Sequence, residues 1–198
     1  AVVSGPTNSG NGSLDYNGTF EISGGLLIAA GSSGMVQANS DTSEQNGMLM
    51  MYPETQAAGT LIHLEDSDGN TIATFAPEKE YAAVFISSPD LAKDSSYTLY
   101  SGGSSTGTET NGLYTDGEYS GGTKVVEFTI SDVVTWLDES GVTEAQSGMM
   151  GGRGGGLPGG AAHDAAQLRR GTQSLRTIHD GDRGRQRAAH RALAALHH

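Results

Sequence analysis

The segments Ala1-Val2-Val3-Ser4-Gly5 and Leu27-Ile28-Ala29-Ala30-Gly31 share one pattern, small or apolar residues that end in glycine, at an offset of 26 positions. Residues 14–25 lie between them, and this stretch is rich in β-forming residues and ends with two glycines. A strand, a glycine turn, a second strand and then recurrence are typical of one rung of a parallel β-helix. A plain β-meander gives a similar pattern. The first third of the chain therefore predicts stacked strands, in a solenoid or a meander.

From residue 47 onward the expected strands are longer and alternate apolar with polar residues. Asp68-Gly69 between two of them predicts a tight hairpin turn. Short connections favour an antiparallel cap or small sandwich that covers the last rung. We expect a Ser/Gly/Thr-rich linker or long loop at residues 101–112, and either a strand or a helical turn at 135–143. The six expected strands are residues 48–52, 60–65, 71–75, 81–87, 97–100 and 124–130.

These patterns predict an all-β protein in four parts. Residues 1–46 are the C-terminal rungs of a parallel β-helix or the stacked strands of a meander, and residues 47–137 are the antiparallel cap. Residues 138–160 are a Gly/Met-rich linker. Residues 161–198 are a basic Ala/Arg/His tail, either an out-of-frame or cloning-derived extension or a basic helix at 186–196. Because five of the six histidines lie in this tail, we do not interpret them as a metal site.

Charge also divides the chain. Residues 1–150 hold three lysines and 20 acidic residues, a net charge of −17, whereas residues 151–198 hold eight arginines and three acidic residues, a net charge of +5. A body this acidic repels phosphate backbones and anionic lipid, so nucleic acid is not expected as a partner. No apolar run is long enough to predict membrane insertion, and the absence of cysteine excludes disulfides and thiolate sites.

Several Gly-rich motifs resemble one family. The stretches 13–25 and 27–35 look like the final rungs of bacterial "carbohydrate-binding domain-containing" proteins, and Leu64-Glu65-Asp66-Ser67-Asp68-Gly69-Asn70, residues 101–107 and residues 117–122 fit the same family. The resemblance covers residues 1–160, the C-terminal part of a family member. It implies an extracellular, calcium-containing right-handed parallel β-helix, similar to pectate lyases, that binds pectic acid or cellulose. We therefore expect a fragment whose signal peptide lies upstream.

Four polar residues around a turn between rungs are candidate calcium ligands: Asn11, Asp15, Asn17 and Glu21. Calcium prefers six to eight oxygen ligands, which carboxylates, amides and backbone carbonyls supply. The alternative is that Asn and Asp are simply turn formers that bond to their own backbone. Asp66-Ser67-Asp68-Gly69-Asn70 also spaces oxygens evenly, but a plain hairpin is the better interpretation.

Three tyrosines, Tyr16, Tyr114 and Tyr119, are candidates for stacking on sugar rings, with ordinary strand packing as the alternative. We therefore expect non-catalytic binding of a plant cell-wall polysaccharide, either a pectic chain bridged by calcium or a cellulose-like chain. A structural surface protein or adhesin is the first alternative. A lyase or glycosidase remnant is the second.

Enzymatic motifs are weak. Gly103-Ser104-Ser105-Thr106-Gly107 matches the nucleophile-elbow pattern but sits in a Ser/Gly run without a following helix. His63, the one histidine of the body, is expected to be a surface residue that pairs across strands. Lyases of the pectate type use a cationic base, commonly arginine. Residues 1–150 contain no arginine, so we assign no catalytic residue.

Overall fold

The structure, a computed structural model, describes residues 1–145. These residues form strands and loops without any helix in this range, which confirms the all-β prediction. No helix in the described range is therefore long and apolar enough to cross a membrane. Most of the expected linker, the tail and the helix considered for residues 186–196 lie outside the described residues.

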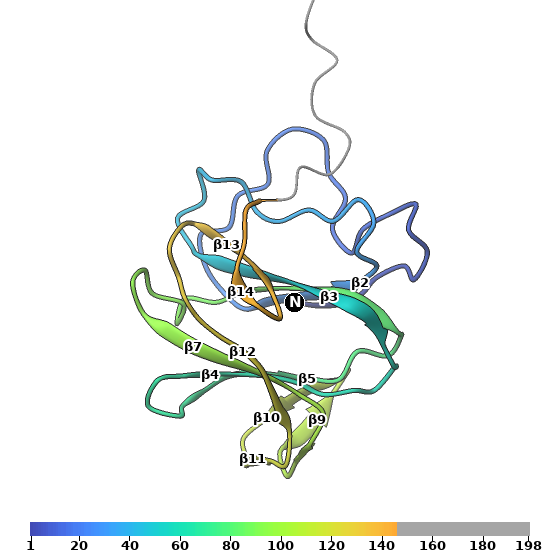
Figure 1. Ribbon diagram of the computed structural model, residues 1–198, viewed down its shortest axis with the longest axis vertical. Helices are drawn as coiled ribbons and strands as arrows, with labels where there is room; N and C mark the ends of the chain where they lie inside the picture. The colour runs from blue at the N-terminus through green and yellow to red at the C-terminus, as the bar shows by residue number, and fades with distance from the viewer. Residues whose placement is uncertain (146–198) are drawn as a thin grey trace, which may run out of the picture. The chain divides into compact units, whose positions relative to one another are not determined.

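Two six-stranded sheets make up the architecture (Figure 1). Sheet A has the order β1-β2-β6-β3-β13-β14, and sheet B has the order β12-β7-β4-β5-β10-β9. The strands of sheet A are β1 (Val2–Ser4), β2 (Leu27–Gly31), β6 (Tyr81–Ser87), β3 (Gly47–Gln56), β13 (Val134–Asp138) and β14 (Gly141–Val142). Those of sheet B are β12 (Thr123–Thr129), β7 (Ser96–Ser101), β4 (Ile62–Asp66), β5 (Thr71–Phe75), β10 (Leu113–Thr115) and β9 (Thr108–Thr110).

A third, small sheet lies beside sheet B. It pairs β8 (Ser104–Ser105) with β11 (Tyr119–Ser120), and we call these two strands the β8–β11 ribbon. Residues 101–112, expected to be a linker or loop, therefore contain two short strands, β8 and β9. Glycine-rich segments such as this one still form strands where a partner is available, and β9 pairs with β10.

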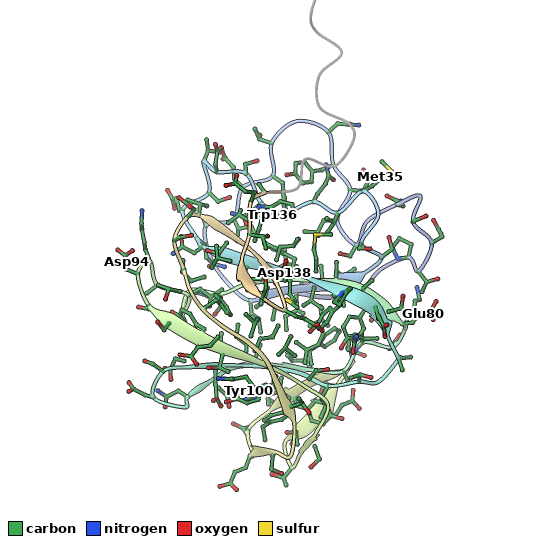
Figure 2. All side chains as sticks on the ribbon, viewed as in Figure 1. Met35, Glu80, Asp94, Tyr100, Trp136 and Asp138 are labelled. Atoms are coloured by element: carbon green, nitrogen blue, oxygen red, sulfur yellow. The ribbon has the colours of Figure 1, made fainter. Side chains whose placement is uncertain are left out.

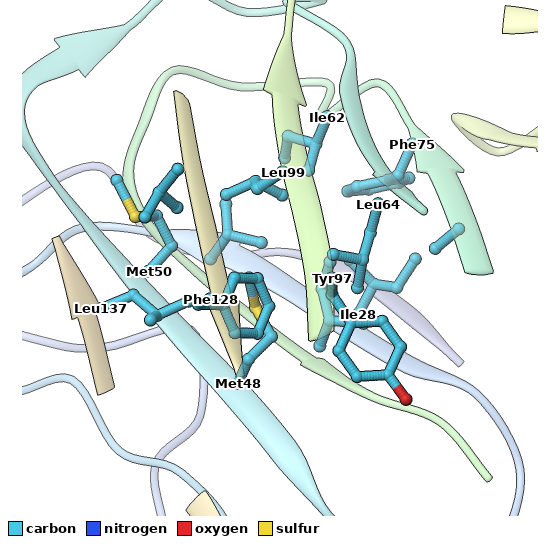
Figure 3. Close-up of a cluster of buried hydrophobic side chains, with 14 of the residues drawn as sticks. Ile28, Met48, Met50, Ile62, Leu64, Phe75, Tyr97, Leu99, Phe128 and Leu137 are labelled. Atoms are coloured by element: carbon cyan, nitrogen blue, oxygen red, sulfur yellow. The ribbon is translucent and has the colours of Figure 1, made fainter. Parts of the chain in front are cut away.

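The two large sheets pack face to face through one apolar cluster (Figure 3). Alternate residues of each strand point inward, as a pleated strand requires. Sheet A contributes Ile28, Met48 and Met50, and sheet B contributes Leu64 and Leu99, all of them fully buried. This core leaves the opposite face of each sheet available for other contacts.

The first two strands pair in the register that the offset of 26 predicts. β1 runs parallel to β2, with Val2 opposite Ile28 and Ser4 opposite Ala30. The loops that follow also run beside each other, because the Ser40 N–H bonds to the Phe20 carbonyl at 2.8 Å and the Gln45 N–H to the Ile22 carbonyl at 3.0 Å. The free side of β2 pairs antiparallel with β6. Two stacked turns of this kind do not by themselves make a β-helix.

These loops cover the outer face of sheet A. Ile22, Val36 and Ala38 from the loops pack on Leu49 and Phe85 of the sheet in a second apolar cluster. Trp136 of β13 packs against the same cluster and lies on this side of the sheet (Figure 2). Sheet A is therefore buried on both faces, and sheet B carries the more open outer face.

The expected strands agree well with the observed ones. Residues 71–75 and 81–87 match β5 and β6 at both ends, and the hairpin at Asp68-Gly69 joins β4 to β5. Gly69 has a positive φ, 81°, and Asp68 does not. Residues 135–143, left open between strand and helix, form the β13–β14 hairpin.

Candidate functional site

A row of side chains crosses the outer face of sheet B. In β4, Ile62 and Leu64 point into the core, so His63 and Glu65 point outward. The register places His63 opposite Tyr100 of β7 on one side and opposite Thr74 of β5 on the other. Thr74 in turn faces Tyr114 of β10. Four neighbouring strands thus bring these side chains onto one surface, and Tyr100 is labelled there in Figure 2.

The expectation that His63 is a surface residue is wrong, because its side chain is only 2% exposed. The ring of Tyr119, from the β8–β11 ribbon, stacks on the imidazole with centroids 3.8 Å apart and planes 12° from parallel. The Tyr119 hydroxyl donates to the Gly102 carbonyl at 2.8 Å, which fixes the other end of the ring. Tyr119 therefore covers His63.

Hydrogen bonds hold both imidazole nitrogens. His63 Nδ1 lies 2.7 Å from Thr74 Oγ1, and Nε2 lies 3.4 Å from Glu65 Oε2. An ionised carboxylate only accepts, so this network assigns the proton to Nε2 and makes the Thr74 hydroxyl the donor to Nδ1. Glu65 Oε1 also accepts from the Tyr100 hydroxyl at 2.8 Å. The cluster is a connected network of hydroxyl, imidazole and carboxylate groups.

Burial controls the protonation of this cluster. Desolvation lowers the pKa of His63 below its ordinary 6.5, and the hydrogen bond and charge of Glu65 oppose that effect only in part. The hydrogen bond to Glu65 raises the pKa of Tyr100, and burial adds to it. Burial likewise raises the pKa of Tyr119. His63 is therefore neutral and both tyrosines are protonated at pH 7.

The hydroxyl–imidazole–carboxylate order resembles the arrangement that activates a nucleophile. Nucleophilic attack requires a hydroxyl that a substrate can reach, and Thr74 and His63 are 3% and 2% exposed. The cluster therefore supports the position of Tyr119 and does not present a nucleophile in this conformation.

A hollow of about 280 Å³ lies beside Tyr119. We call it the tyrosine hollow, because Tyr114 and Tyr119 both line it. Asp116 is the single ionisable carboxylate among its lining residues, and the remaining polar groups are hydroxyls. Its lining residues with polar side chains are Thr71, Thr74, Ser105, Tyr114, Thr115, Asp116 and Tyr119. Two of the three tyrosines singled out from the sequence thus meet at one site.

The third, Tyr16, lies elsewhere. It belongs to the loop that covers sheet A, and its hydroxyl donates to the Ala38 carbonyl at 2.6 Å. Its ring packs 5.3 Å from that of Phe20, in a tilted geometry. Tyr16 therefore contributes to the contact between the two stacked loops and does not line the hollow.

The candidate calcium ligands Asn11, Asp15, Asn17 and Glu21 are all exposed in the same covering loop. Glu21 Oε1 accepts a hydrogen bond from Thr42 at 2.7 Å. Within residues 1–145, no three His, Cys, Asp or Glu side chains gather closely enough to hold a metal ion.

The Asp66 loop is a hairpin. Asp66 Oδ1 accepts from the backbone N–H groups of Asp68 and Asn70 at 2.9 and 2.8 Å, and Oδ2 accepts from the Asn70 amide at 2.8 Å. These bonds lower the pKa of the carboxyl. The G-x-S-x-G pattern lies on β8, which no helix follows within the described residues, so it is not a nucleophile elbow.

No family model matches the chain, and neither a curated protein nor a solved structure matches it. The geometry of the site is thus the basis for any functional proposal.

Proposed function

We propose that residues 1–145 form a non-catalytic polysaccharide-binding module and that the tyrosine hollow contacts the sugar chain. The observation that carries this proposal is that Tyr114 and Tyr119 line one hollow together with four accessible side chains that bear hydroxyl or carboxylate oxygens, Thr71, Ser105, Thr115 and Asp116. Sugar rings present apolar C–H faces that pack on aromatic rings, and their hydroxyls pair with hydroxyl and carboxylate groups. A concave, mostly neutral surface of this kind suits a carbohydrate.

The negative charge of Asp116 in the hollow distinguishes between an acidic and a neutral glycan. Asp116 repels a uronate, so a pectic chain requires a bridging cation, whereas a cellulose-like chain does not. We propose calcium as that cation for the pectic case, shared between Asp116 and the uronate. The two types of ligand therefore differ in their response to a chelator. We also keep Asn11, Asp15, Asn17 and Glu21, in the loop over sheet A, as proposed ligands of a separate calcium ion, because none of them lines the hollow.

We also propose that residues 1–46 are the terminal rungs of a right-handed parallel β-helix that acts outside the cell or on its surface. The parallel register of β1 on β2 and the hydrogen bonds between the two following loops support this proposal. β6 pairs with the last parallel strand and covers its free edge, as expected of a cap.

A retention assay on insoluble cellulose and on immobilised polygalacturonate tests the function, each with and without EGTA. We expect retention of the full chain, and we expect Tyr114→Ala to weaken it about fivefold to tenfold, since one aromatic contact contributes about 1 kcal/mol. Thr108→Ala, at an exposed position of β9 outside the hollow, is the matched control. Loss of retention in EGTA on polygalacturonate alone would assign the calcium-bridged ligand.

Other results would redirect the proposal. A loss with Tyr16→Ala but not with Tyr114→Ala would move the sugar surface to the loops over sheet A. Release of reducing ends from either glycan would indicate an enzyme. Retention on no glycan, together with self-association or attachment to cells, would contradict sugar binding and favour the adhesin.

A further inference from the structure

Tyr119 is held by a short element. The strand β11 has two residues and pairs only with the two residues of β8 within the described part of the chain. Beyond that pairing, the Tyr119 ring stacks on His63 and lies 6.1 Å, between centroids, from the ring of Tyr100, and its hydroxyl bonds to the Gly102 carbonyl. An element with so few bonds opens locally far more readily than a central strand. The stack on His63 is the closest of the few side-chain contacts that dock the ribbon on sheet B.

Titratable groups surround His63 from each element packed against it. Glu65 lies on the same strand, Tyr100 on β7 has its ring centroid 6.0 Å away, and Tyr119 on β11 stacks at 3.8 Å. Thr74 on β5 supplies a hydroxyl, which cannot neutralise charge. Glu65 is thus the one opposite charge in contact with an imidazolium at this position, and at 3.4 Å its bond to Nε2 is long.

We propose that His63 is a positioning residue that couples the docking of Tyr119 to pH, with acid weakening the docking. This inference rests on the proposed function only where it concerns sugar binding, because Tyr119 forms a wall of the tyrosine hollow. When Tyr119 lifts away, water reaches the imidazole and the cost of charging it falls. The undocked form therefore binds a proton more tightly than the docked form.

The direction of the pH effect follows from the linkage between protonation of His63 and docking of Tyr119. Burial lowers the pKa of docked His63 below the 6.5 of an exposed histidine, and exposure on undocking restores it. Docking is then strongest above pH 6.5 and weakens as pH falls toward the pKa of the docked form. Attraction between an imidazolium and the face of the Tyr119 ring reduces this effect, as does Glu65. Glu65 does not reverse the effect, because the pKa of His63 stays lowered with the hydrogen bond and charge of Glu65 included.

Hydrogen exchange on the full chain tests the proposal without any glycan. Exchange of peptides within residues 103–121 is measured at pH 7.5, 6.5, 5.5 and 5.0, corrected for the intrinsic rate at each pH. We expect protection of these peptides to fall with acid, approaching about tenfold for each pKa unit between the two forms. Peptides from β3 and β6 in the central part of sheet A report on global stability and are expected to stay protected.

Two variants separate titration from packing. His63→Phe keeps an aromatic ring under Tyr119 but cannot be protonated, so protection of residues 103–121 should no longer depend on pH. Glu65→Gln leaves the imidazole in place and removes the opposing charge, so the loss of protection should continue to lower pH than in the parent protein. A purely structural role for His63 would not move this pH profile.

A protection profile that does not change with pH in the parent protein would overturn the proposal, and so would an unchanged pH dependence in His63→Phe. If a glycan is retained in the assay above, its affinity should fall between pH 7.5 and 5.0 in the parent protein but not in His63→Phe. If no glycan is retained, the exchange result still decides the proposal, so its failure is distinct from failure of the proposed function.

Discussion

At the scale of the residue, Asp66 shows how one side chain can define a turn. Its two carboxylate oxygens accept three hydrogen bonds from the loop that they close. Asp68, two residues later, accepts none from the described residues and is exposed. The two aspartates lie in the same loop and carry the same charge, but only Asp66 has a structural role in the turn.

We expect Asp66→Ala to lower the melting temperature at pH 6 and Asp68→Ala to leave it nearly unchanged. The pKa of the Asp66 carboxyl is lowered in the folded protein, mainly by the side-chain bond from Asn70. Its contribution is therefore fully present above the unfolded value of 3.8 and is lost as pH falls through the folded pKa. Thermal melts of the three proteins from pH 6 to pH 2.5 measure this. A difference between Asp66→Ala and the parent that persists at the acidic end would contradict the assignment.

At the scale of the element, the pairing of β1 with β2 depends on the glycine that ends each echoed segment. A Cβ on Gly5 would lie 2.7 Å from Ser13 Cα, and one on Gly31 would lie 3.0 Å from Ser13 Cβ. The first loop thus crosses close over the ends of both strands. Gly24, in the same loop, has nothing within 4 Å of such an atom.

We expect Gly5→Ala to reduce the free energy of unfolding by about 1–3 kcal/mol, the usual cost of forcing an extra carbon into a packed site. Gly24→Ala is the matched control, and its effect should stay within about 0.5 kcal/mol, as for most surface changes. Urea unfolding followed by far-UV circular dichroism measures both. Equal effects of the two substitutions would show that the close crossing at Ser13 is absent in solution.

The strands of sheets A and B show which parts of the fold the sequence pattern predicts and which it does not. The offset of 26 predicts the register of β1 on β2, and alternation with turn residues predicts β5 and β6 to the residue. The insertion of β6 between β2 and β3 has no local signal, because nothing in these three strands specifies which neighbours meet. His63 and Glu65 share a face by alternation alone. Tyr119, which covers His63, lies on a ribbon distant in sequence, so alternation alone predicts an exposed His63 although the structure buries it.

At the scale of the whole molecule, charge is the dominant imbalance. The full chain has a net charge of −12, and its first 150 residues combine three lysines with 20 acidic residues. Only one ion pair in the described range, Lys124 with Glu127 at 3.2 Å, joins a lysine to a carboxylate. Because it is exposed, its contribution is small. Mutual repulsion of carboxylates therefore opposes the compact state.

We expect the melting temperature of the full chain to rise as NaCl increases from 20 mM to 0.5 M, since the screening length falls below about 10 Å above 0.1 M salt. Calcium chloride at matched ionic strength separates screening from binding, with magnesium chloride as the control for divalent charge. A bound ion stabilises in proportion to the logarithm of its concentration over its Kd, so bound calcium should give a rise beyond that in magnesium. If the loop residues hold it, Asp15→Asn combined with Glu21→Gln should remove that extra rise and leave the response to NaCl intact. Equal melting temperatures in the two divalent salts would contradict calcium binding by the loop residues over sheet A, whereas a calcium ion shared between Asp116 and a uronate is tested by the retention assay with EGTA.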